Sequence, residues 1–80
     1  MVRSPWMPGG MKLTYHSDTD SLYIAFVDHP SVESTEIVAG VVVDLDGQGR
    51  VVGIDIDNAR NKVDLERVVV SAVPGFIEVA

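Results

Sequence analysis

The chain has 80 residues, no cysteine, a net charge of −6 and 46% apolar residues. Its length allows one domain, and the lack of cysteine excludes disulfides and thiolate metal sites. Affinity for nucleic acid comes largely from Lys and Arg, so an acidic chain is not expected to bind it. No apolar run approaches the ~20 residues of a membrane span, and no signal peptide is recognisable. We therefore expect a cytoplasmic protein with no membrane partner.

The first ten residues, MVRSPWMPGG, differ from the rest of the chain. Their two prolines and paired glycines break strands and helices, whereas regular periodicity begins at Met11, which could itself be a start codon. We predict that residues 1–10 are a disordered leader or an early-called start. Residues 11–80 are predicted to form a single small β-rich domain.

Three strands are predicted in the first half of the domain. Apolar and polar residues alternate over residues 11–16, a pattern typical of a half-buried strand. A polar turn follows, and residues 22–27 form a second, more apolar run. Pro30 ends this run because it has no N–H for a strand ladder. Residues 34–39 are predicted to form the third strand.

A β-hairpin is the strongest local signal in the chain. Residues 41–45 and 51–57 are rich in β-branched side chains, and a short Asp-Gly-x-Gly loop joins them. In the second arm, Val52, Ile54 and Ile56 alternate with mainly acidic or small residues. One face of this strand is therefore predicted to be apolar and the other acidic.

The period changes after the hairpin. Leu65, Val68, Val69 and Ala72 recur at i, i+3, i+4 and i+7, which predicts a short amphipathic helix. The valines at 68–70 lower helix propensity, so a strand is the alternative.

The predicted fold class is α+β. It is an antiparallel sheet of four to five strands, arranged as hairpins or a meander, with one C-terminal amphipathic helix packed on one face. The predicted core consists of Leu13, Tyr15, Leu22, Ile24, Phe26, Val42, Val52, Ile54, Ile56, Leu65, Val68 and Val69.

Short motifs follow one another in a fixed order over about two thirds of the chain. They are Met11-Lys12-Leu13-Thr14-Tyr15, Asp18 to Asp20, Leu22-Tyr23-Ile24, Gly40 to Asp44, Asp46-Gly47 and Val52-Gly53-Ile54-Asp55-Ile56. In order and spacing they resemble the prokaryotic family known as domain of unknown function 2283. The resemblance implies a β-rich fold with Met11 as its natural start, and no established activity. Because some members are encoded beside genes that resemble toxin genes, it also implies an antitoxin-like role.

Pairs of carboxylates offer one candidate site. Side chains at i and i+2 of a strand share a face, and the hairpin contains Asp44 with Asp46 and Asp55 with Asp57. Such oxygen ligands suit Mg²⁺ or Ca²⁺, which makes a small divalent-metal-dependent enzyme the alternative function. A solvated acidic face with turn-forming aspartates explains the same pattern. We therefore assign no catalytic residue and no cofactor.

Charge and size favour an interaction function. Arg60, Lys62 and Arg67 lie within eight positions and are candidates for a partner-binding face, or a solvated flank. The acidic charge suits a basic protein partner. A sheet this small leaves an edge or an apolar face uncovered, which predicts a homodimer. The predicted function is a non-catalytic protein-interaction module, antitoxin-like, that acts as a small homo-oligomer.

Overall fold

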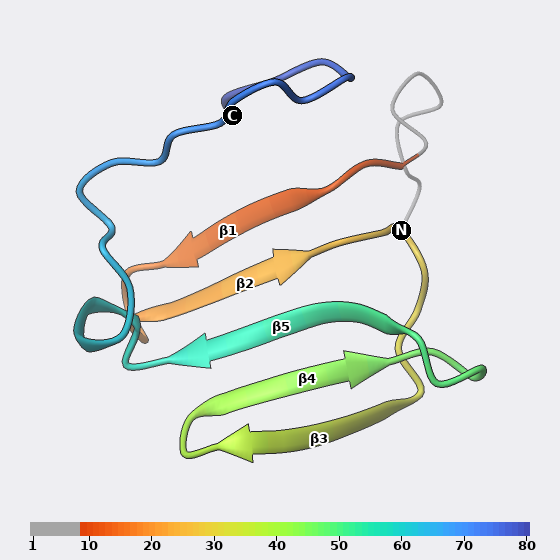
Figure 1. Ribbon diagram of the computed structural model, residues 1–80. Helices are drawn as coiled ribbons and strands as arrows, with labels where there is room; N and C mark the ends of the chain where they lie inside the picture. Colours follow the sequence, from red (N-terminus) through yellow and green to blue (C-terminus); the bar gives the residue numbers. More distant parts are fainter. Residues whose placement is uncertain (1–8) are drawn as a thin grey trace.

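A computed structural model describes residues 9–80, and residues 12–57 contain the strands of one open five-stranded antiparallel sheet (Figure 1). The strands are β1 (Lys12–His16), β2 (Ser21–Ala25), β3 (Glu33–Val38), β4 (Val41–Leu45) and β5 (Val51–Asp57), and a single 3₁₀ turn, η1 (Ala59–Asn61), follows them. All five predicted strands are confirmed to within two residues. The predicted leader falls mostly on residues 1–8, which lie outside the described residues.

The strand order is β1-β2-β5-β4-β3, so the sheet is built from hairpins but is not a meander. A meander would place β3 beside β2, whereas β5 occupies that position and pairs with both β2 and β4. The apolar side chains of Val52 and Ile56 on β5 are buried, and a strand with such residues gains most from the centre of a sheet. The more polar β3, exposed along its whole length, takes the edge.

The predicted C-terminal helix is wrong. Residues 64–80, called the C-terminal segment below, contain neither helix nor strand and run outward past β1 (Figure 1). Consecutive valines at 68–70 lose side-chain rotamer freedom in a helix, and Ala72 has a left-handed φ of 55° that no helix accommodates. The alternative prediction, a strand, is not borne out either. Val68 and Val69 of the predicted core remain 66% and 67% exposed.

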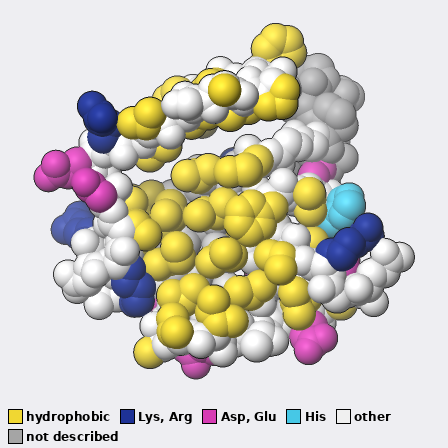
Figure 2. Space-filling model, in the orientation of Figure 1, with side chains coloured by type: hydrophobic (Ala, Val, Ile, Leu, Met, Phe, Trp, Pro, Cys, Tyr) yellow, Lys and Arg dark blue, Asp and Glu magenta, His cyan; other side chains and the backbone are white. Residues whose placement is uncertain are grey.

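Strand pairing aligns apolar residues in rows on one side of the sheet. Across β1, β2, β5 and β4, Leu13, Ile24, Ile54 and Val43 form one row, and Tyr15, Leu22, Ile56 and Val41 form the next. Figure 2 shows the hydrophobic side chains gathered on this side. We call the eight residues of the two rows the apolar face.

The core lies where the apolar face meets η1. Leu22, Ile56 and the fully buried Ala59 form its centre, and Val63 and Leu65 pack against them. The sequence prediction missed Ala59. The predicted core residue Val42 is opposite Asp55 on the other side of the sheet, because the side chains of adjacent strand residues point to opposite faces. Its neighbours Val41 and Val43 lie on the apolar face instead.

Candidate functional site

The side of the sheet opposite the apolar face is polar and carries most of the strand carboxylates. Tyr23, Asp55, Val42 and Glu36 form one row across four strands, and Gly53, Asp44 and Ser34 belong to the next. Asp57 lies at the end of β5, opposite Ser21. Below, the acidic face means these six residues: Tyr23, Ser34, Glu36, Asp44, Asp55 and Asp57.

A hydrogen bond at the centre of the acidic face spans three strands. The Tyr23 hydroxyl on β2 donates to Asp44 Oδ2 on β4 at 2.8 Å, although β5 runs between these two strands. The ring passes over Gly53 of β5, where a Cβ atom would lie 2.7 Å from Tyr23 Cζ. Glycine at this position therefore makes room for the ring.

The environment of Tyr23 favours its protonated form. Burial raises the pKa of the Tyr23 hydroxyl to about 12, and the hydrogen bond to Asp44 and the charges of Asp44 and Asp55 act in the same direction. At neutral pH Tyr23 is thus a hydrogen-bond donor and not a base.

The carboxylate of Asp44 accepts hydrogen bonds through both of its oxygens. Oδ2 accepts from Tyr23, and Oδ1 accepts from Ser34 Oγ at 2.7 Å. Asp44 is therefore held in one orientation between β2 and β3. Each of these two hydrogen bonds is made to the charged Asp44 carboxylate and favours this orientation of its side chain.

Asp55 occupies a less favourable position on the same face. Burial raises its pKa, the negative charges of Asp57 and Asp44 raise it further, and His16 offsets part of the effect. The ionised form of Asp55 is therefore disfavoured in the folded protein. Asp57, by contrast, accepts a hydrogen bond from Ser21 Oγ at 3.3 Å.

The fourth candidate metal ligand, Asp46, lies apart in the β4–β5 loop. Its Oδ1 accepts hydrogen bonds from the backbone N–H groups of Gln48 and Arg50, and Arg50 Nε donates to Oδ2 at 3.2 Å. These backbone hydrogen bonds, followed by the Arg50 side chain, lower the pKa of Asp46. Asp46 stabilises the loop, as a turn aspartate does.

The structure thus brings together three of the four predicted metal ligands, Asp44, Asp55 and Asp57, on one face of the sheet. Within residues 9–80, however, no group of three or more His, Cys, Asp or Glu side chains is arranged to hold a metal ion. The two oxygens of Asp44 are already engaged by Tyr23 and Ser34. The arrangement favours a hydrogen-bonded surface over a coordination site.

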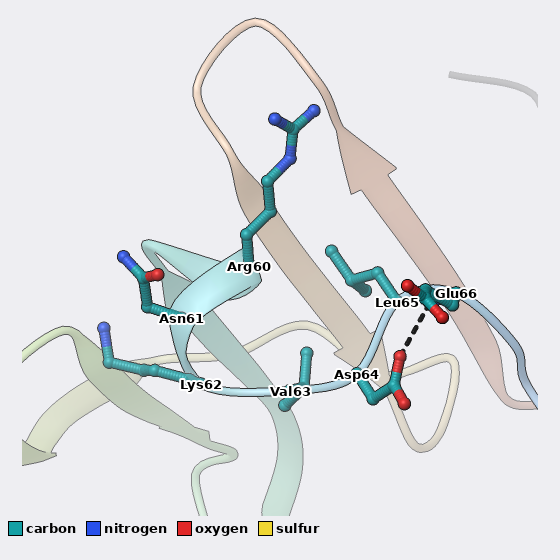
Figure 3. Close-up of a pocket in the computed structure, with 7 residues that line it drawn as sticks. All are labelled: Arg60, Asn61, Lys62, Val63, Asp64, Leu65 and Glu66. Carbon is teal, nitrogen blue, oxygen red and sulfur yellow. Dashed lines mark hydrogen bonds between the residues drawn. The ribbon is translucent and has the colours of Figure 1, made fainter.

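The basic candidates do not form one surface. Arg60 Nε lies 3.9 Å from Asp20 Oδ1 beside the β1–β2 turn, whereas Lys62 Nζ donates to the backbone carbonyl of Asp57. Figure 3 shows the Arg60 and Lys62 side chains pointing in different directions around an open hollow lined by residues 60–66. Arg67 lies beyond that loop in the exposed C-terminal segment.

Asp20 has a structural role that the sequence prediction missed. Its carboxylate accepts hydrogen bonds from Tyr15 Oη at 2.8 Å and from the backbone N–H of Arg60 at 3.2 Å, and its carbonyl accepts from the N–H of Ala59. These hydrogen bonds of Asp20 therefore hold η1 against the β1–β2 turn. Its place in a polar turn was visible in the sequence, but its partner forty residues away was not.

Comparison with known proteins gives a family and no activity. Residues 12–60, more than half of the chain, match the family model described as "Protein of unknown function (DUF2283)". No curated protein and no solved structure matches the chain. The matched segment contains all five strands and most of η1, and it ends before the C-terminal segment. Within the described part of the chain, no helix is long and apolar enough to cross a membrane.

Proposed function

We propose that this chain, which belongs to the DUF2283 family, is a non-catalytic protein-interaction module whose acidic face binds a basic protein. One observation carries this proposal: four carboxylates, those of Glu36, Asp44, Asp55 and Asp57, share one side of an open sheet. An open charged surface suits contact with another macromolecule, because electrostatic complementarity steers association and sets its specificity.

The geometry of the acidic face supports binding over catalysis. General acid–base catalysis needs a titratable group that can reach a substrate proton. Tyr23 and Asp44 instead point at each other, and Ser34 donates to the same carboxylate. These contacts fix the positions of the polar atoms, and fixed groups lose little conformational entropy when a partner docks.

The charge of the chain defines the partner's chemistry. With a net charge of −6, the chain attracts a protein with exposed Lys and Arg and repels nucleic acid. An antitoxin-like role is one form of this function, in which the acidic face covers a basic surface of a toxin. Affinity of this kind weakens as salt screens the charges.

The proposal is tested by affinity capture from a prokaryotic lysate, followed by mass spectrometry at low and high salt. The tagged protein is compared with an Asp55→Asn/Asp57→Asn variant of the acidic face. A Glu66→Gln/Glu78→Gln variant of the C-terminal segment is the matched control, since it changes the net charge by the same amount. We expect a basic partner that is captured at low salt by the wild type and the control, and lost with the acidic-face variant. Equal capture by all three proteins would contradict the proposal.

A further inference from the structure

We propose that two copies of the chain pack their apolar faces together, and that the C-terminal segment of each copy lies against the other copy. This surface is on the opposite side of the sheet from the acidic face. The inference therefore stands independently of the proposed function.

The apolar face has the composition of an interior. Its two rows cross four strands without a charged residue: Leu13, Ile24, Ile54 and Val43, then Tyr15, Leu22, Ile56 and Val41. An open antiparallel sheet normally packs such a face against a helix or a second sheet.

Within residues 9–80, the chain buries two of the eight residues of this face, Leu22 and Ile56, and leaves Leu13 exposed and the other five half-buried. Leu65 and Val68 of the C-terminal segment line a groove with Leu13, Tyr15 and Leu22 on β1 and β2, and Arg60 lines the same groove. Beyond these residues the segment runs outside the edge of its own sheet (Figure 1). Only Leu22, Val52, Ile56 and Ala59 are buried among the apolar residues described, which is a thin core for a domain of this length.

The dimensions of the sheet favour a dimer that includes the C-terminal segment. The four strands of the apolar face, spaced about 4.8 Å apart and each about 17 Å long, give an area of about 330 Å². A stable interface buries about 800 Å² on each partner, so the sheet alone supplies less than half of that area. The C-terminal segment offers the remainder through the exposed side chains of Val68, Val69, Val70, Val73, Phe76, Ile77 and Val79.

The distribution of charge also permits a second copy to bind here. Two molecules of charge −6 repel each other, but their strand carboxylates gather on the acidic face. In Figure 2 the charged side chains lie around the margin of the apolar side. Face-to-face packing therefore places the acidic faces outward, away from each other. A two-fold axis brings identical surfaces together, as in most dimers.

The course of the C-terminal segment favours its exchange between the two copies. Packed sheets cross at an angle of about 30° and lie about 10 Å apart. A segment that extends past β1 of one sheet then flanks the facing sheet. The side chain of Phe76 is fully exposed in the single chain, and the facing copy supplies an apolar surface for it.

The experiment is size-exclusion chromatography with light scattering on the full chain and three variants, across a range of concentrations. Phe76→Asp alters a side chain that is fully exposed in the single chain, so its fold is unaffected. Leu13→Lys places a charge on the apolar face at a residue that is 46% exposed. Val32→Asp is the matched control, because Val32 is exposed in the β2–β3 loop outside both surfaces. Circular dichroism establishes that each variant keeps its sheet.

We expect a dimer for the wild type and the control. Both other variants should raise the dimer dissociation constant at least about tenfold, since a buried Phe or Leu contributes about 1.5–3 kcal/mol and 1.4 kcal/mol is tenfold. A monomeric wild type at high micromolar concentration would overturn the proposal. A dimer that Phe76→Asp leaves unchanged would overturn the role of the C-terminal segment.

Mixing the two variants tests the exchange itself. If Phe76 of one copy meets Leu13 of the other, a Leu13→Lys copy and a Phe76→Asp copy together restore one native contact and place Lys opposite Asp at the other. We expect the mixed dimer to form at lower concentration than either variant dimer. No gain on mixing would overturn a contact between Phe76 of one copy and Leu13 of the other.

Discussion

Tyr23 and Asp44 are hydrogen-bonded to each other across a third strand, which contains neither residue. Tyr23 lies on β2 and Asp44 on β4, and Gly53 of the intervening β5 provides the space for the tyrosine ring. Cross-strand contacts normally join neighbouring strands. This contact ties together the three central strands on the acidic face, and its dependence on a glycine makes it testable.

Gly53→Ala should destabilise the protein. The added Cβ atom would lie 2.7 Å from Tyr23 Cζ and 3.0 Å from the Ile24 carbonyl oxygen, so the ring must move and its bond to Asp44 is lost. Overpacking and loss of a hydrogen bond each cost about 1–3 kcal/mol. We expect a decrease of at least about 2 kcal/mol in the free energy of unfolding, measured by urea denaturation.

The Tyr23→Ala background is the control for this prediction. Without the ring, most of the obstruction at position 53 disappears, and Ala is otherwise favoured over Gly within a strand by about 0.5–1 kcal/mol. Gly53→Ala should therefore be much less destabilising in that background, where only the contact with the Ile24 carbonyl oxygen remains. If it is as destabilising there as in the wild type, the glycine is required for a reason other than the tyrosine ring.

The Tyr23 hydroxyl should lose its proton only at an unusually high pH. Burial, the bond to Asp44 and the nearby carboxylate charges raise its pKa from 10.0 to about 12. Because the folded-state pKa exceeds the unfolded value, this group's contribution to stability is complete below pH 10 and is lost as the pH rises toward 12. The chain has two tyrosines, so a Tyr15→Phe variant isolates the tyrosinate absorbance of Tyr23. An absorbance midpoint near pH 10 in the folded variant would contradict the burial and hydrogen bonding described.

Asp55→Asn and Asp46→Asn should change stability in opposite directions. The pKa of Asp55 is raised, so its contribution is complete below about pH 3.8 and is lost as the pH rises through the folded-state value. Removing its charge should therefore stabilise the protein at pH 7, by less than about 1 kcal/mol for a carboxylate near the surface. Thermal unfolding at pH 7 and at pH 3 measures the gain, which should be absent at the lower pH.

Asp46 is the matched comparison. Its pKa is lowered by backbone N–H donors and Arg50, so its contribution is present above about pH 3.8 and is lost as the pH falls through the folded-state value. Asp46→Asn should lower the melting temperature at pH 7. If both substitutions shift the melting temperature at pH 7 in the same direction, the result would contradict the opposite pKa shifts of Asp55 and Asp46.

Local patterns predicted the strands, because five or six consecutive residues are enough to recognise the alternation of apolar and polar side chains. The two-residue period identified the strands, and the Asp-Gly loop identified the β4–β5 hairpin. The position of β5 between β2 and β4 depends on pairing between residues more than thirty positions apart, such as Leu22 with Ile56. No local pattern encodes that pairing.

The candidate site was predicted in part for the same reason. The alternation along residues 51–57 indicated an acidic side, and Asp44, Asp55 and Asp57 do share it. The hydrogen bonds that decide the role of each carboxylate join residues from different strands, as in Tyr23 with Asp44. The predicted helix failed because a helical spacing of Leu65, Val68 and Val69 was outweighed by consecutive β-branched residues.

Divalent cations should leave the melting temperature unchanged. A metal ion on the acidic face would have to compete with Tyr23 and Ser34 for the oxygens of Asp44. Asp46 lies in the β4–β5 loop, where Gln48 and Arg50 already engage its carboxylate. We expect no shift when the full chain is titrated with Mg²⁺, Mn²⁺ or Ca²⁺ and then with chelator. A ligand at one hundred times its dissociation constant would add about 2.7 kcal/mol, so a site with a dissociation constant of about 0.1 mM is detected at about 10 mM cation. A rise of several degrees that disappears in Asp55→Asn, and persists in Asp46→Asn, would instead place a metal on the acidic face and favour the metal-dependent enzyme.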